Sequence, residues 1–155
     1  MPTKALSYIN NTHLPLEIPA GINDIIKMKN FKKYFVIPAT PEEIYRALTT
    51  EVTIRLWTGD IVEIDPREGG EFSMWDGAIT GRFITLTPFE KIVQEWYFGD
   101  QEEKSIVTFK LHEHKKGTSF EVNHSNIPDD DYEGIVSGWE EEYIASLIDF
   151  YEDEE

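Results

Sequence analysis

Two of the four histidines stand two residues apart, a spacing that puts potential metal ligands on one face of a β-strand. His112 and His114 belong to the segment KSIVTFKLHEH. A zinc site needs further ligands from a neighbouring strand, and this pair adjoins a turn at Lys115–Gly117. We therefore interpret both histidines as solvated surface residues and expect no bound metal.

A third histidine, His124, is the best candidate for a titratable group inside the protein. It shares its strand parity with Phe120 and Val122 in GTSFEVNHS, so the three side chains are expected to face the same way. The simpler interpretation is a buried histidine with a hydrogen-bond partner, and a ligand-anchoring or acid–base role is the alternative. Both parities of KIVQEWYF are apolar, so this segment leaves open whether Gln94 or Glu95 points inward.

Other charged residues give weaker catalytic signals. Arg82, in AITGRFITL, could anchor a carboxylate in a cavity, although pairing with a glutamate of a neighbouring strand is the simpler interpretation. Paired-carboxylate catalysis needs two acids that converge in a pocket, whereas the acids near one predicted hairpin have the spacing of a solvated face. These acids are Glu63, Asp65, Glu68 and Glu71. We expect no catalytic residue among them.

The composition excludes several classes of protein. The chain has 155 residues with 30 acidic and 14 basic side chains, a formal net charge of −16 and no cysteine. Such a negative surface repels phosphate backbones and anionic headgroups, which disfavours nucleic-acid binding. Without cysteine there is no disulfide framework or thiolate-bound zinc. No segment resembles a membrane span or a signal peptide, so we expect a cytoplasmic protein without a cofactor.

The end of the chain carries the clearest helical pattern. In DDDYEGIVSGWEEEYIASLIDFYE, large apolar residues recur at steps of three and four and form one stripe. They are Tyr132, Val136, Trp139, Tyr143, Leu147 and Phe150. The pattern predicts a buried helix that begins at the acidic residues 129–131. On its polar face Glu140 and Glu141 are either solvated or available to a basic partner, including the lysine cluster of KMKNFKK.

The other elements predict a sheet and two short helices. Thr40, Pro41 and Glu43 form a capping-box pattern for one helix, and EVTIRLW predicts a second that ends near Gly59. Strands are predicted at 31–37, 60–65, 70–75, 78–86, 91–98, 104–114 and 117–125. Since the connections between strands are short, the strands are expected to pair as an antiparallel meander.

The fold class that follows is α+β, with a curved antiparallel sheet of six to seven strands wrapped around a long C-terminal helix. We expect one domain over residues 31–152, preceded by an extended arm or added edge over residues 1–30 and followed by an acidic tail at 153–155.

A sheet that bends around one helix leaves space beneath it, and the sequence predicts a cavity there. The simpler interpretation of the aromatic residues is a plain core, and the alternative is that they line a binding site. The residues expected to line it are Arg82, Trp96, Phe109, Phe120, Val122, His124, Trp139, Tyr143 and Leu147.

Five blocks of the chain occur in an order that one known family shows. They are PEEIYRALTTEVTIRLWTG, GGEFSMWDGAITGRF, LTPFEKIVQEWYF, GTSFEVNHSNIP and GWEEEYIASLIDFYE. Over about residues 31–152 the chain resembles the activator of heat shock protein 90 ATPase homologue (AHSA1-like) group of the START-like, or SRPBCC, superfamily. The resemblance implies a helix-grip fold with a hydrophobic cavity. The eukaryotic co-chaperone has a separate chaperone-binding domain ahead of this one, for which residues 1–30 are too few.

Three functional hypotheses follow. The first is non-enzymatic binding of a small hydrophobic molecule in the cavity between the sheet and the last helix. The second, which the resemblance implies, is a chaperone- or stress-linked interaction protein that acts through Glu140 and Glu141. The third is a cyclase- or hydrolase-like enzyme that uses His124 or Glu95 inside the cavity.

Overall fold

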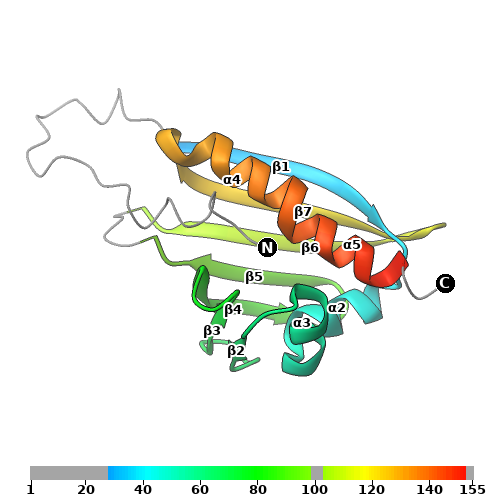
Figure 1. Cartoon of the computed structure of the whole chain (residues 1–155). Helices are drawn as coiled ribbons and strands as arrows, with labels where there is room; N and C mark the ends of the chain where they lie inside the picture. The colour runs from blue at the N-terminus through cyan, green and yellow to red at the C-terminus, as the bar shows by residue number, and fades with distance from the viewer. Residues whose placement is uncertain (1–27, 99–102, 153–155) are drawn as a thin grey trace, which may run out of the picture.

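The computed structural model describes residues 28–98 and 103–152. In these ranges seven antiparallel strands form one sheet in the order β1-β7-β6-β5-β4-β3-β2 (Figure 1). The strands are β1 (Met28–Ile37), β2 (Glu63–Ile64), β3 (Glu71–Met74), β4 (Ile79–Thr87), β5 (Lys91–Trp96), β6 (Ser105–His114) and β7 (Gly117–Pro128). From β2 to β7 each strand pairs with the next one along the chain, and β1 closes the other edge by pairing with β7. The predicted helix-grip architecture is confirmed.

Six of the seven strands differ in length from the prediction, among them both edge strands, β1 and β2. Only Glu63–Ile64 of the predicted strand 60–65 forms strand pairs with β3. Ahead of it, the Asp60 carboxylate accepts the Ile61 N–H at 2.7 Å and satisfies that backbone donor locally. At the other edge β1 begins at Met28, where its register with the end of β7 continues. Three residues of the predicted N-terminal extension therefore belong to the sheet. Residues 1–27 and the predicted tail 153–155 lie outside the described residues.

Both short helices form where the sequence predicts them. In α2 (Pro41–Thr49) the capping box is complete, since Thr40 Oγ1 accepts from the Glu43 N–H and Glu43 Oε1 accepts from the Thr40 N–H. The next helix, α3 (Glu51–Thr58), ends at Gly59, which adopts a left-handed φ of 69°. Within the described residues, none of the helices combines the length and the apolar character that a bilayer crossing requires.

The C-terminal helix consists of four consecutive segments. A 3₁₀ turn (Asp129–Asp131) leads into α4 (Tyr132–Gly138), a π-helical turn follows at Trp139–Tyr143, and α5 (Ile144–Glu152) completes the helix. Figure 1 shows the helix lying over one face of the sheet, with its end directed toward α2 and α3.

The π turn changes which residues the helix buries. In this turn the Ile144 N–H donates to the Trp139 carbonyl, five residues earlier instead of four. The extra residue changes which side of the helix the positions after Trp139 occupy. Trp139, Tyr143 and Leu147 are buried as the stripe predicted, but Tyr132, Val136 and Phe150 are only half-buried. The buried positions that the stripe omits are Ile135, Ile144 and Tyr151. A strict helical period could not reveal this shift.

We predict that Gly81→Ala destabilises the fold because the sheet leaves no room for a side chain at this position of β4. A Cβ atom at Gly81 would collide with the Glu95 carbonyl oxygen and lie 2.9 Å from Phe72 Cζ. We expect the free energy of unfolding in urea to fall by about 1–3 kcal/mol. The control is Thr80→Ala on the opposite face of the same strand. Equal stability of the two variants would contradict the close approach.

Candidate functional site

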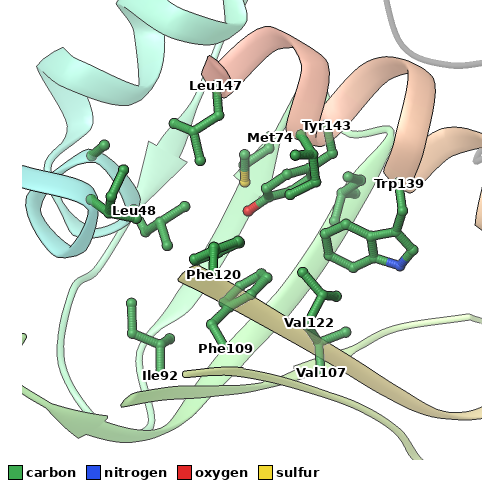
Figure 2. Close-up of a cluster of buried hydrophobic side chains, with 14 of the residues drawn as sticks. Leu48, Met74, Ile92, Val107, Phe109, Phe120, Val122, Trp139, Tyr143 and Leu147 are labelled. Carbon is green, nitrogen blue, oxygen red and sulfur yellow. The ribbon is translucent and has the colours of Figure 1, made fainter. Parts of the chain in front are cut away.

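The aromatic residues predicted to line a cavity lie together beneath the C-terminal helix, where they contact one another. Trp139 stacks on Trp96 with ring centroids 5.0 Å apart, and its ring centroid lies 4.7 Å from that of Tyr143. On the sheet side the Phe109 and Phe120 rings stack at 5.0 Å. Figure 2 shows Trp139 and Tyr143 projecting from the helix toward this pair. Rings from both layers therefore occupy the predicted binding space.

Burial values agree with this packing. Eight of the nine predicted lining residues are at most 3% exposed, with Val122 and Leu147 completely buried. The single ring of Trp139 contacts Trp96 of β5, Phe109 of β6 and His124 of β7, and so touches three strands. A ligand at this position would have to displace side chains that now pack against each other.

A polar relay crosses this apolar core and joins the helix to the sheet. The Trp139 indole N–H donates to His124 Nδ1 at 3.0 Å. On the other side of the ring, His124 Nε2 lies 2.6 Å from Ser105 Oγ, which in turn donates to the Ser125 carbonyl at 3.3 Å. All the members are thereby hydrogen-bonded, which is the condition for keeping polar groups in a core.

The relay fixes the tautomer of His124. Because an indole N–H can only donate, Nδ1 must accept, and the neutral ring carries its hydrogen on Nε2. Burial lowers the pKa of His124 to about 3, so the ring is neutral near pH 7. Burial also raises the pKa of Tyr143, whose hydroxyl stays protonated. The chemistry therefore differs from that of a catalytic dyad: Nε2 donates to Ser105 and cannot take its proton.

The structure shows on which face of the sheet the polar residues of β4 and β5 lie. Gln94 is opposite the inward-facing Val107 and accepts from the Trp96 indole at 2.8 Å, so it lies on the helix side. Glu95 faces the other way, and its Oε1 accepts from Arg82 Nε at 2.9 Å. Arg82 therefore lies outside the sheet–helix space, in the cross-strand pair that the sequence offered as the simpler interpretation. Neither charged residue can serve a ligand beneath the helix from this position.

The other two histidines of the described residues, His112 and His114, make local contacts. His112 Nε2 lies 2.9 Å from Glu121 Oε1, and His114 Nδ1 accepts from the Lys116 N–H at 3.0 Å. Among the described residues, no group of three or more His, Asp or Glu side chains is placed to hold a metal ion. Two of the lysines near the acidic helix pair with it inside the same chain: Lys33 with Glu140 at 2.6 Å and Lys29 with Asp129 at 3.0 Å.

A second hollow lies on the sheet face turned away from the helix. Its volume is about 420 Å³, and it is open to solvent beside β2 and β3. Three of the predicted surface acids line it, namely Glu63, Asp65 and Glu71. The Tyr97 hydroxyl, which also lines the hollow, donates to Glu71 at 3.0 Å. Glu68, the fourth acid, instead accepts from the Leu86 N–H at 3.0 Å.

Two residues of this core were missed by reasoning from the sequence. Ser105 shares its strand parity with Val107 and Phe109, so alternation along β6 could have placed it beside His124. Trp75 was predicted as the last residue of the strand 70–75 but lies in the turn after β3, where it is 4% exposed and contacts Tyr143 at 5.5 Å.

Comparison with known proteins adds independent information. The family described as "Activator of Hsp90 ATPase homolog 1-like protein" matches residues 38–151. The human "Activator of 90 kDa heat shock protein ATPase homolog 1" is 30% identical over 131 residues, which are 83% of this chain and 38% of that protein. The Dictyostelium discoideum "Activator of 90 kDa heat shock protein ATPase homolog" is 29% identical over 112 residues, which are 70% of this chain and 29% of that protein. The chain thus spans well under half the length of these relatives.

Solved structures show the same fold. The crystal structure of an HSP90 activator from Plasmodium falciparum matches with a TM-score of 0.70 and 26% identity, covering 78% of this chain and 94% of that one. The solution structure of the Aha1 dimer from Colwellia psychrerythraea matches with a TM-score of 0.67 and 22% identity, covering 79% of this chain and 95% of that one.

The buried histidine makes stability depend on pH in a predictable way. Its folded pKa of about 3 lies below the usual 6.5, so between these values the unfolded chain binds more protons and folding loses stability as the pH falls. We expect wild type to lose up to about 1.4 kcal/mol per pH unit more than His124→Gln in urea unfolding over this range.

The control is His114→Gln at the end of β6, which leaves the relay intact and should keep the wild-type slope. Parallel stability curves for wild type and His124→Gln would show that the buried ring does not titrate in this way.

Proposed function

Because this chain belongs to the Activator of Hsp90 ATPase homolog 1-like family, we propose that it binds an Hsp90-type chaperone and stimulates the chaperone's ATPase activity. One observation carries the proposal. The HSP90 activator from Plasmodium falciparum is matched over 94% of its structure at 26% identity, so the shared fold makes up nearly all of that structure. This supports an activator role for a unit of this size.

The packed interior of this domain is better suited to regulating a partner protein than to catalysing a reaction itself. A protein that supplies no catalytic group can still raise a partner's rate, provided that it binds the active conformation more tightly than the inactive one. The achievable stimulation is limited by that difference in affinity. A densely packed domain is suited to this task because it keeps its shape when a partner binds to its surface.

Charge supplies the second part of the proposal. A net charge of −16 attracts basic surfaces over several ångströms and raises the association rate, an effect that salt screens. Lys33 pairs with Glu140 and partly neutralises its charge. Among the described residues, Glu141 accepts a hydrogen bond from the uncharged Ser137 hydroxyl and forms no ion pair. The acidic helix face is therefore proposed to guide encounter with the chaperone.

The second candidate function is binding of a small apolar molecule between the sheet and the helix. It starts from the helix-grip architecture and requires Trp139 or Tyr143 to leave its present packing. An enzymatic role is weaker still, because His124 is engaged on both nitrogens and Glu95 faces away from the helix.

The chaperone proposal is tested with the purified chain and a purified Hsp90-type chaperone. We expect the steady-state rate of ATP hydrolysis to rise several-fold at low salt and the stimulation to shrink as salt increases. Glu140→Gln/Glu141→Gln should slow association at low salt, whereas the charge-matched control Glu90→Gln/Glu113→Gln, at exposed positions of the β4–β5 turn and of β6, should not. Absence of both calorimetric binding and stimulation at every salt concentration would refute the proposal.

The small-molecule candidate is tested by titrating wild type with lipid and aromatic-metabolite panels. Readouts are tryptophan fluorescence and thermal shift, since ligands that bind only the native state raise the unfolding temperature. We expect no saturable response, because the rings of Trp96, Trp139 and Tyr143 occupy the space. A saturable response that is lost in Tyr143→Trp, which adds volume beneath the helix, would establish the carrier role instead.

A further inference from the structure

The outer face of α3 exposes large apolar side chains. Val52 and Leu56, four residues apart on one helix face, are 67% and 64% exposed, and Ile61, in the loop that follows, is 50% exposed. We call these three residues the α3 patch. The opposite face of the same helix buries Ile54 and Trp57, so packing against the domain does not explain the patch. Clustered exposed apolar residues of this kind mark sites where another molecule docks.

Local contacts hold the patch in shape. Arg55 reaches from α3 to the Val62 carbonyl at 3.2 Å, which ties the Ile61 loop back to the helix. The Ile61 carbonyl in turn accepts from the Asp76 N–H at 3.0 Å, so the turn between β3 and β4 borders the patch. Figure 1 shows α3 near the β2–β3 edge of the sheet.

The bordering turn has a strained backbone. Trp75 and Asp76 have φ angles of 51° and 53°, which non-glycine residues rarely adopt. The Trp75 ring is anchored in the core against Trp57 at 5.8 Å and Tyr143 at 5.5 Å, and this anchoring holds the turn in place. Strain that is retained in this way is typical of recognition sites, because it fixes a side chain before the partner arrives. The residue of this turn that lies beside the patch is Asp76, whose N–H reaches the Ile61 carbonyl.

The charges around the patch are unbalanced. Arg55 is engaged by Glu51 at 3.5 Å as well as by the Val62 carbonyl. Asp60 and Asp76 have no ion-pair partner among the described residues, and they leave the rim negative. A second copy of this chain would bring another charge of −16 to the contact, so electrostatics oppose self-association and favour a basic partner.

We propose that the α3 patch and its acidic rim form a docking surface for a basic amphipathic segment of another protein. Aliphatic side chains of that segment cover Val52, Leu56 and Ile61, while its lysine or arginine side chains pair with Asp60 and Asp76. This inference goes beyond the proposed function, since it assigns a surface and a partner chemistry whether or not the partner is a chaperone. The patch is small, so the expected complex is transient.

The test uses a fluorescein-labelled helical peptide of leucine and lysine, with a serine–lysine peptide of equal charge and a leucine–glutamate peptide of opposite charge as comparisons. We expect wild type to bind the leucine–lysine peptide best, with an affinity that falls as salt rises. Val52→Ser/Leu56→Ser should weaken this binding by about ten-fold or more. The matched control Tyr34→Ser/Val36→Ser removes two exposed apolar residues from β1 and should leave binding unchanged.

Photoreactive leucine at position 56 identifies the occupant by mass spectrometry of the cross-linked product. A cross-link to the leucine–lysine peptide supports the proposal, whereas a cross-link to a second copy or to residues 1–27 of this chain overturns it. Equal binding by wild type and the serine variant, or no preference for the basic peptide, also overturns it. A chain that binds the peptide at the patch but fails to stimulate the chaperone would remove the proposed function and leave the docking surface standing.

Discussion

The hydrogen bond from the Trp139 indole to His124 Nδ1 is the contact on which the arrangement of helix and sheet depends. It joins the start of the π turn to the middle of β7 inside an apolar core, where an unsatisfied acceptor would be strongly unfavourable. Since Nδ1 must accept, His124 stays neutral and passes a hydrogen bond on to Ser105. One polar relay thus joins the helix to β6 and β7, and the aromatic rings pack around it.

The packing around this relay leaves the outer surface of the domain as the place where the proposed function is carried out. The residues that would have to bind a ligand, or move a proton, beneath the helix are already engaged with each other. The outer surface, by contrast, carries excess negative charge and an exposed apolar helix face. Family membership and surface chemistry therefore support the same class of function, in which the domain acts by contact with another protein.

Patterns in the sequence predict the architecture well because they report local periodicity. Three patterns each predicted an element correctly: the capping box at Thr40, the alternation along β6 and β7, and the helical stripe through Trp139. The π turn, the inward choice of Gln94 over Glu95 and the burial of Trp75 were out of reach, since each depends on packing between distant segments. For the same reason the sequence could not tell whether the predicted cavity is open or filled, since side-chain volume and rotamer decide this.

The protonation state of the His124 ring tests the central relay most directly. It can be read from imidazole nitrogen shifts in uniformly labelled protein, at pH 7 and again at pH 5. We predict a neutral ring at both values, with the hydrogen on Nε2 and none on Nδ1. An imidazolium ion at pH 5, or a hydrogen on Nδ1, would contradict the relay and the closed interior that it organises.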